Sequence, residues 1–246
     1  MSRPPVVGIE AVTFDFWNTL VVDGGTAGRD HRLDAWMGVL EDSGFAVERG
    51  ALDAAMAASW DVFLEAWRSN RQYTHVEAAV DILDQLGHRV PPDVHDRLLA
   101  SFHYDETDSP SLTEGVAECL AVLHGNGVRL GIICDVGMTP STALRDILSR
   151  YDVLQFFSHW SFSDEVGAYK PAGEIFAHAL AGLGGVAPAA AAHVGDLKRT
   201  DVAGALAFGM TAVRYAGSFD DSASEGPEAT FVIASHADLP GVLGLG

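Results

Sequence analysis

A short apolar stretch that ends in a carboxylate constrains this chain more than any other feature. Residues 12–16, Val-Thr-Phe-Asp-Phe, are β-branched or aromatic apart from Asp15, and they follow Pro4 and Pro5. A short run of this kind predicts a buried strand rather than a helix. Asp15 then lies at the carboxyl end of the strand, where open α/β sheets bind their ligands. Asn18 tolerates the left-handed backbone conformation that a tight turn after the strand requires.

Length and composition allow one large domain or two smaller ones. The chain has 246 residues, of which 48% are hydrophobic, so it can bury a sizeable core. No apolar run approaches the roughly 20 residues of a spanning helix, and the first residues lack the pattern of a signal peptide. We therefore expect a cytoplasmic protein. The two cysteines, Cys119 and Cys134, are too few for a disulfide framework and are expected to be reduced thiols.

The charge balance limits the partners. Fifteen Lys and Arg against 34 Asp and Glu give a net charge of −19, which repels nucleic acid and anionic membrane surfaces. The same field opposes a phosphorylated substrate. A site for such a substrate must therefore be made locally positive by a metal ion and a few cationic side chains.

Residues 28–103 are predicted to be helical almost throughout. Apolar side chains recur at helical spacing in four segments: 31–40, 50–68, 76–86 and 92–102. In the second segment Leu52, Met56, Trp60, Phe63 and Trp67 share one face, which we expect to form the core of a small helical bundle. The acidic stretch 105–110 is predicted to be a linker. Residues 21–109 are thus predicted to form a separate helical domain.

From Ser111 onward helices alternate with short apolar strands, which is typical of a parallel sheet with crossover helices. Strands are predicted at 128–134, 159–162, 191–194 and 211–215, with helices at 113–124, after Pro140, at 172–183 and at 202–208. Residues 1–20 and 110–246 are therefore predicted to form an α/β core, a Rossmann-like parallel sheet with helices on both faces. Such a sheet brings the polar strand ends to one edge: Asp15, Cys134-Asp135, Ser163-Asp164 and Gly195-Asp196.

Four motifs occur in order in this sequence, at residues 15–20, 130–135, 167–171 and 193–196, the last followed by Asp201. Together they resemble the motifs of the haloacid dehalogenase-like hydrolase superfamily with a helical cap inserted after the first strand. Residues 15–20 resemble the nucleophile motif, and residues 130–135 stand where the family has a strand that ends in Ser or Thr. Residues 167–171, Gly-Ala-Tyr-Lys-Pro, resemble the lysine motif. Residues 193–196, His-Val-Gly-Asp, followed by Asp201, resemble the acidic metal motif. The match covers nearly the whole chain, and the cap is its least specific part.

The resemblance implies a set of roles. Asp15 is the expected nucleophile, which forms an aspartyl-phosphate. Mg²⁺, which prefers oxygen ligands, is expected on Asp15, Asp196 and the backbone carbonyl of Trp17, with Asp201 in contact with the ion or behind it. Lys170 is expected to neutralise the nucleophile and to bind phosphate, together with Cys134 and Asp135. Each residue also has a structural alternative: the aspartates as helix or turn caps, and Lys170 as a surface lysine.

Two departures from the family pattern leave alternatives open. Phosphatases of the superfamily carry a second Asp where this chain has Trp17, and an indole cannot exchange a proton near pH 7. Cys134 and Asp135 replace Ser or Thr followed by Asn, which weakens the expected phosphate cup. The favoured prediction is a Mg²⁺-dependent phosphohydrolase acting on a small phosphorylated metabolite. The alternatives are a 2-haloacid dehalogenase, which also lacks the second Asp, and a catalytically impaired member that binds a ligand or a protein. The sequence carries no signal for the substrate or the oligomeric state.

Overall fold

A computed structural model describes residues 8–23, 27–104 and 110–245, and the predicted linker at 105–110 lies almost wholly outside these ranges. The chain divides into two compact units. The first contains residues 1–22, 111–135 and 148–246, and the second contains residues 23–110 and 136–147. No helix in the described ranges is long and apolar enough to cross a membrane.

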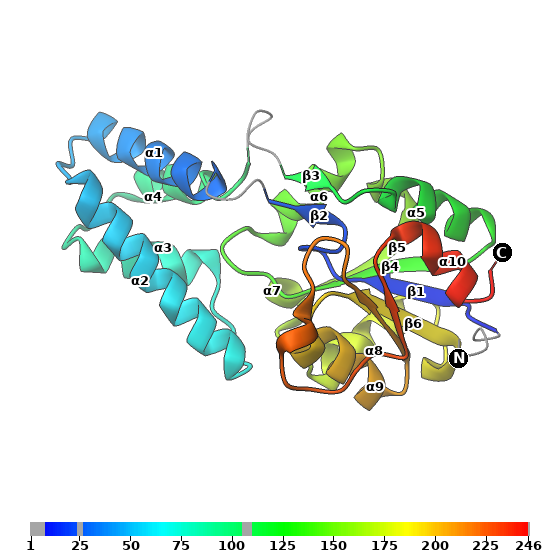
Figure 1. The fold of residues 1–246 in the computed structure, drawn as a ribbon. Coiled ribbons are helices and arrows are strands. Elements are labelled where there is room, and N and C mark those ends of the chain that lie inside the picture. The colour runs from blue at the N-terminus through cyan, green and yellow to red at the C-terminus, as the bar shows by residue number, and fades with distance from the viewer. Residues whose placement is uncertain (1–7, 24–26, 105–109, 246) are drawn as a thin grey trace. The chain divides into compact units, whose positions relative to one another are not determined.

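The first unit is built on a six-stranded sheet in the order β5-β4-β1-β6-β7-β8. All five pairings between neighbouring strands are parallel, which confirms the predicted α/β class (Figure 1). The strands are β1 (Ala11–Phe14), β4 (Arg129–Cys134), β5 (Phe157–Phe162), β6 (Ala191–Gly195), β7 (Thr211–Tyr215) and β8 (Phe231–Ile233).

β1 lies in the middle of the sheet because its side chains are buried on both faces. It pairs with β4 on one side and with β6 on the other. Beyond β1 the amide of Asp15 still donates to the carbonyl of Val194, at 2.8 Å. A continuous apolar run is what a doubly covered parallel strand requires, so this short segment sets the position of the whole sheet.

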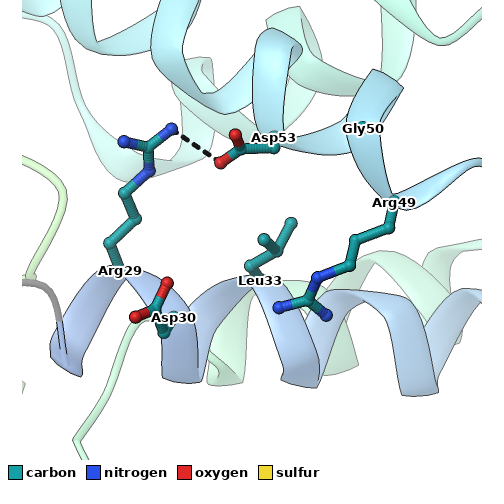
Figure 2. A pocket seen from close by; sticks show the side chains of 6 residues that line it. All are labelled: Arg29, Asp30, Leu33, Arg49, Gly50 and Asp53. Atoms are coloured by element: carbon teal, nitrogen blue, oxygen red, sulfur yellow. Dashed lines mark hydrogen bonds and ion pairs between the residues drawn. The ribbon is translucent and has the colours of Figure 1, made fainter.

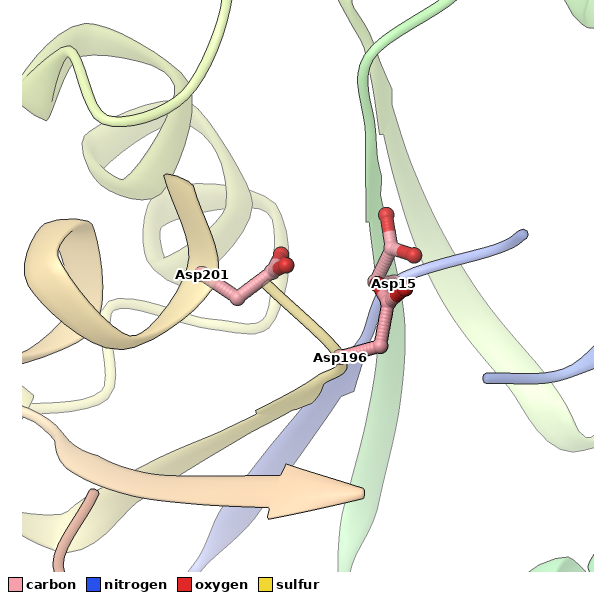
Figure 3. Close-up of side chains that lie close together, drawn as sticks. All are labelled: Asp15, Asp196 and Asp201. Carbon is pink, nitrogen blue, oxygen red and sulfur yellow. The ribbon is translucent and has the colours of Figure 1, made fainter. Parts of the chain in front are cut away.

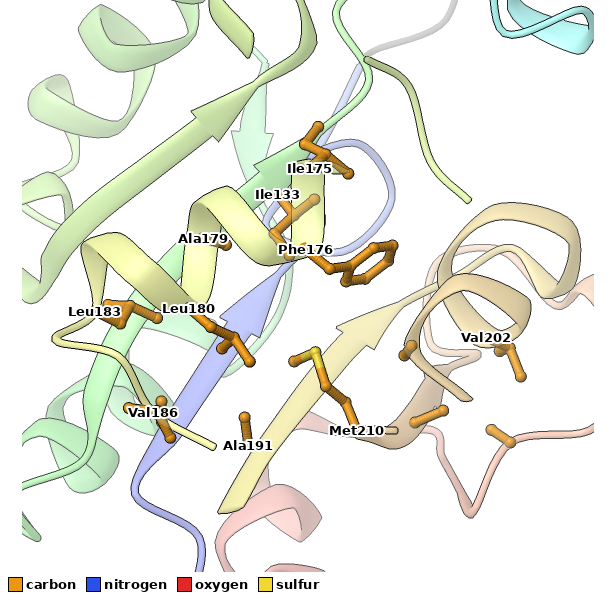
Figure 4. Close-up of a cluster of buried hydrophobic side chains, with 14 residues drawn as sticks. Ile133, Ile175, Phe176, Ala179, Leu180, Leu183, Val186, Ala191, Val202 and Met210 are labelled. Atoms are coloured by element: carbon orange, nitrogen blue, oxygen red, sulfur yellow. The ribbon is translucent and has the colours of Figure 1, made fainter. Parts of the chain in front are cut away.

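Helices cover both faces of the sheet, as predicted. On one face α8 (Gly173–Gly182) and α9 (Ala203–Phe208) pack on a buried cluster in which Ile175, Phe176 and Leu180 meet Ile133 of β4 and Ala191 of β6 (Figure 4). The other face carries α5 (Val116–Gly125) and α10 (Leu239–Val242) (Figure 1). The short α7 (Ser163–Val166) follows β5 directly.

Three strands had no clear sequence signal. β2 (Val21–Val22) and β3 (Ser111–Leu112) form a two-residue antiparallel pair beside the main sheet. β8 is only three residues long and exposes Val232, so it lacks the alternation that identifies a strand. Short 3₁₀ turns occur at 154–156, 188–190, 221–223 and 236–238, and a π-helical turn spans Lys198–Val202.

The second unit contains the four predicted helices: α1 (Ala27–Asp42), α2 (Arg49–Arg68), α3 (His75–Gln85) and α4 (Pro92–Ala100). Most of α6 (Ser141–Arg150) also belongs to it. Thr74 and Glu77 form a capping box at the start of α3. The expected apolar face of α2 is buried at Leu52, Met56 and Phe63, but Trp60 remains 46% exposed, so the expectation was wrong for that residue.

Candidate active site

The order of the central strands explains why the candidate site forms at one edge of the sheet. β4, β1 and β6 are neighbours and run in the same direction. Their carboxyl ends are followed by Asp135, Asp15 and Asp196 respectively. Three carboxylates separated by up to 181 positions in the chain are thereby brought to the same edge, as the sequence predicted.

Lys170 is buried between two of the carboxylates. Its Nζ lies 2.5 Å from Oδ1 of Asp15 and 2.6 Å from Oδ1 of Asp201. The ammonium also donates to the carbonyl of Ile133, at 3.2 Å. The three donor protons of the ammonium are therefore all directed to oxygen, and the structural alternative of a surface lysine is wrong.

Asp201 is held by four donors. Oδ1 accepts from Lys170 and lies 3.0 Å from Nε2 of His193, while Oδ2 accepts from the amide of Leu197 at 3.0 Å and from the hydroxyl of Thr200 at 3.3 Å. A carboxylate offers about four lone-pair positions. The hydrogen-bonding capacity of Asp201 is therefore fully used within the protein.

Gly195 is required by this arrangement. A Cβ added at this position would lie 2.3 Å from Cγ of Asp201, closer than real contacts allow. The glycine of the His-Val-Gly-Asp motif thus lets the Asp201 carboxylate approach the end of β6. This reason for the glycine was not apparent from the sequence.

Asp196 is bound less completely than Asp201. Among the residues that the structure describes, its Oδ2 accepts one hydrogen bond, from the side-chain amide of Asn18 at 3.2 Å. Asn18 has a φ of 58°, which confirms the expected left-handed turn after the first strand. Oxygen atoms of Asp15, Asp196 and Asp201 all lie within 4.8 Å of one another, and Figure 3 shows the three side chains converging.

The electrostatics of the cluster favour a bound cation. Burial raises the pKa of Asp15 to about 7, against the opposing effect of the Lys170 charge. Burial and the negative charges of Asp15 and Asp201 raise the pKa of Asp196 to about 8. Asp201 is also buried, but the positive charge of Lys170 and the hydrogen bond from His193 keep its pKa below the usual range.

A divalent metal fits this donor set. The three carboxylates are buried and close together, and the ammonium of Lys170 contacts two of them, Asp15 and Asp201. Hard oxygen donors are the ligands that Mg²⁺ prefers. An added cation would relieve the repulsion that raises the pKa of Asp196.

The other residues predicted for the site, Cys134, Asp135 and Trp17, differ from one another in burial and in contacts. The side chain of Cys134 is fully buried, and its Sγ lies 3.6 Å from the carbonyl of Asp135. Burial raises the pKa of the Cys134 thiol well above its usual value, so it stays protonated. Oδ1 of Asp135 accepts a hydrogen bond from the backbone amide of Lys170, at 2.8 Å. Trp17 is partly exposed and packs edge-on against Phe16.

Sequence reasoning missed one residue that supports the site. His193 is part of the acidic motif, but the sequence alone indicates no role for its side chain. Its ring is buried, with Nε2 toward Asp201 and Nδ1 2.9 Å from the hydroxyl of Thr13. Burial lowers the pKa of His193, which favours the neutral ring. A neutral ring that donates from Nε2 to Asp201 accepts at Nδ1 from Thr13.

The family model for haloacid dehalogenase-like hydrolases matches residues 9–209, which include every residue of this site. The chain belongs to that family. The hydrolase is 33% identical over 118 residues to a mouse protein described as haloacid dehalogenase-like hydrolase domain-containing protein 3. This alignment covers 47% of the chain and 45% of the mouse protein, so the chain matches about half the length of that curated relative.

Solved structures show the same fold. The hydrolase resembles a haloacid dehalogenase-like phosphatase from Thermococcus onnurineus with a TM-score of 0.63, 21% identity and coverage of 96% and 98% of the two chains. It resembles a 2-haloacid dehalogenase from Pseudomonas syringae with a TM-score of 0.69, 21% identity and the same coverage. At this level of identity the likeness concerns the fold and not the reaction.

Proposed function

We propose that this family member is a Mg²⁺-dependent phosphohydrolase that acts on a small phosphorylated metabolite through Asp15. The observation that carries the proposal is the convergence of Asp15, Asp196 and Asp201 within 4.8 Å around the buried ammonium of Lys170. Phosphoryl transfer needs positioning and neutralisation of charge more than it needs bond-making groups. This cluster offers a nucleophilic carboxylate, a cation and a place for a second cation.

Each residue of the cluster has a distinct task in the proposed reaction. Asp15 attacks phosphorus through a carboxylate oxygen, and the leaving oxygen departs with the electrons of the broken bond. Water then hydrolyses the aspartyl-phosphate and releases inorganic phosphate. Lys170 orients Asp15 and offsets negative charge as the phosphate approaches.

Asp15, Asp196 and the Trp17 carbonyl would hold Mg²⁺. We place Asp201 behind the ion, because its four hydrogen bonds already use its oxygens. When bound, the metal supplies positive charge that draws the phosphate into an acidic protein and stabilises the transferring group.

Cys134 and Asp135 contribute to the proposed phosphate cup mainly through the backbone. The buried thiol of Cys134 is a weak donor, and the Asp135 carboxylate is hydrogen-bonded to the amide of Lys170. The hydrogen bond at Asp135 positions the lysine and partly offsets the repulsion that its charge exerts on a phosphate.

Trp17 favours substrates with good leaving groups. Without a second Asp at this position, the leaving oxygen receives no proton from a neighbouring acid. General acid–base help is typically worth about 10²–10⁴-fold. Acyl phosphates and other donors with acidic leaving groups need the least help, so we propose that these react fastest.

The presence of Trp17 in place of a second Asp also supports a second candidate function, that of a 2-haloacid dehalogenase. In that reaction Asp15 would attack carbon and expel a halide, which requires neither an acid nor a metal. The close carboxylates of Asp196 and Asp201 argue against it, since they concentrate negative charge where an acidic substrate would bind.

Residues 21–109, most of which lie in the second unit, are proposed to form an inserted helical cap that contributes to substrate selection. We also propose a cytoplasmic enzyme without a nucleic-acid partner, which the net charge of −19 supports.

A screen of phosphate esters, acyl phosphates and 2-haloacids, each with and without Mg²⁺, tests the proposal. Phosphate release that requires Mg²⁺ is the expected result. Halide release independent of Mg²⁺ would replace it with the dehalogenase. Absence of any turnover would instead favour a member that only binds its ligand.

A further inference from the structure

The second unit contains an arginine whose buried donor has no partner. Arg32 lies on α1, and its Nε atom is buried without a hydrogen bond among the residues that the structure describes. Its guanidinium stacks on the ring of Phe102, with Cζ 4.9 Å from the ring centroid. Stacking uses the face of the guanidinium and leaves the N–H groups at its edge available for a planar acceptor.

A second unpartnered donor lies one helical turn away. Trp36 is fully buried, and its indole Nε1 also lacks a hydrogen-bond partner in the described ranges. Residues four apart on a helix lie on the same face. The Trp36 ring packs edge-on against Phe102 as well, with centroids 6.1 Å apart. Phe102 therefore lies against both donor-bearing side chains.

The neighbouring residues shape this face of α1 without satisfying the two donors. A Cβ at Gly28, one turn before Arg32, would lie 2.7 Å from the Tyr104 ring, so the glycine allows Tyr104 to pack there. The Tyr104 hydroxyl donates to Asp23, at 3.2 Å. The Asp23 carboxylate is thus engaged by Tyr104 and acts on Arg32 only through space. Burial lowers the pKa of Arg32, which marks its charge as poorly compensated.

We propose that Arg32 and Trp36 form a binding site for a carboxylate in the second unit. Unpaired buried donors are costly, and in native proteins they are usually met by a ligand or an ordered water. A carboxylate matches the edge of a guanidinium with two parallel hydrogen bonds. The nearby negative charge of Asp23 disfavours a dianionic phosphate more than a singly charged carboxylate. This inference is independent of the reaction proposed for Asp15.

A nearby arginine provides the control. Arg29 lies one turn earlier on α1, and its guanidinium is paired with Asp53 at 2.6 Å (Figure 2). Arg29 and Asp53 line an open cleft of about 390 Å³, together with Asp30, Leu33, Arg49 and Gly50. Both arginines carry the same charge, but only Arg32 has a buried donor without a partner. If binding depended only on general positive charge, replacing either arginine would weaken it. Binding at the proposed site should be weakened only when Arg32 is replaced.

The test uses the indole N–H of Trp36 as a local probe. ¹⁵N-labelled protein is titrated with sodium acetate, sodium phosphate or sodium chloride at constant ionic strength, and the Trp36→Phe variant identifies the Trp36 signal among the five tryptophans. We expect acetate to move that signal saturably and at lower concentration than phosphate. Arg32→Gln should weaken the response about tenfold or more, and Arg29→Gln should leave it unchanged.

Each other outcome overturns the inference. An unmoved Trp36 signal in the wild-type protein excludes the site, whatever the arginine variants show. If the Trp36 signal responds equally in Arg32→Gln and in the wild type, Arg32 is not part of the site. The four other indole signals report whether that variant is folded. Tighter binding of phosphate than of acetate rejects the assignment to a carboxylate.

Discussion

Lys170 and Asp201 form a buried ion pair in which Nζ lies 2.6 Å from Oδ1. The pair fixes the ammonium between Asp201 and Asp15, and it is held from behind by His193. These contacts favour a position for Asp201 behind the proposed Mg²⁺ over direct coordination of the ion. Removal of one member of such a buried pair is strongly destabilising, because the other charge is then left without compensation.

Replacement of the proposed nucleophile gives the first prediction. Asp15→Asn should reduce turnover by more than about 10⁴-fold, because the amide cannot form an aspartyl-phosphate. Lys170 keeps its ion pair with Asp201 in this variant, so circular dichroism should show an unchanged fold. Phosphate release at the wild-type rate would eliminate the covalent mechanism.

Magnesium affinity distinguishes the carboxylates. Loss of an outer partner of a metal site typically costs about 10–100-fold in affinity. We therefore expect titration calorimetry to show a loss of about 100-fold or more for Asp196→Asn and a smaller loss for Asp201→Asn. Asp238→Asn, an equal change of charge at an exposed position, is the control. Equal affinities in all three variants would reject the ligand assignment.

Gly195→Ala tests the packing of the Asp201 carboxylate against the end of β6. The new methyl would lie 2.3 Å from Cγ of Asp201 and must displace it. Overpacking of this kind typically costs about 1–3 kcal/mol, which urea denaturation measures. Gly125→Ala, where nothing lies within 4 Å of the added atom, is the matched control. Similar free energies of unfolding for both variants would show that Asp201 moves freely.

His236 should make the stability of the first unit depend on pH. Burial lowers its pKa from 6.5 to about 4. Nε2 lies 2.9 Å from the carbonyl of Thr19, whereas Nδ1 is buried and has no partner among the described residues, so a second ring proton would be unsatisfied. The unfolded chain therefore binds a proton at higher pH than the folded chain. The stability from neutral His236 is fully present above about pH 6.5 and is lost as the pH falls toward 4.

The shift of the His236 pKa should lower the free energy of unfolding by up to about 3 kcal/mol as the pH falls. The free energy of unfolding is measured at pH 7 and pH 4 for wild type and for His236→Gln, which retains a side-chain N–H donor. Between pH 7 and pH 4 the His236→Gln variant should lose less stability than the wild type. His124→Gln, at an exposed position on α5, should behave as the wild type. An unchanged pH dependence in His236→Gln would contradict the pKa assigned to this ring.

The positions of the site carboxylates could be predicted because they depend on local sequence pattern. A short apolar run identifies each strand, and parallel strands bring their carboxyl ends to one edge. Asp15 and Asp196 therefore followed from the pattern alone. Asn18 followed from its tolerance of a positive φ, although its hydrogen bond to Asp196 did not.

Contacts between distant parts of the chain could not be predicted in this way. Thr13 and His193 are 180 positions apart and meet only because β1 and β6 pair in register. The need for glycine at position 195 likewise arises from the side chain of Asp201, which reaches back across the motif. Strand β8 was missed because three residues with an exposed centre carry no periodic signal.

The last prediction concerns Trp17, which lies two residues after the proposed nucleophile. If no base activates the water, hydrolysis of the aspartyl-phosphate should be the slow step. Acetyl phosphate should then label Asp15, and intact mass spectrometry should detect the label. Trp17→Asp should shorten the lifetime of the intermediate and raise turnover of alkyl phosphates, by as much as about 10²–10⁴-fold if the new carboxylate acts as acid and base.

Asp135 provides the necessary comparison, because it is an acidic residue that follows β4, the strand next to β1. One of its oxygens is bound to the amide of Lys170. If the second oxygen served as the missing base, the wild-type intermediate would be short-lived and Asp135→Asn would trap it. Circular dichroism shows whether loss of the large Trp17 side chain leaves a damaging cavity. Rapid hydrolysis of alkyl phosphates by the wild type, with neither substitution altering the intermediate, would show that Trp17 does not limit this enzyme.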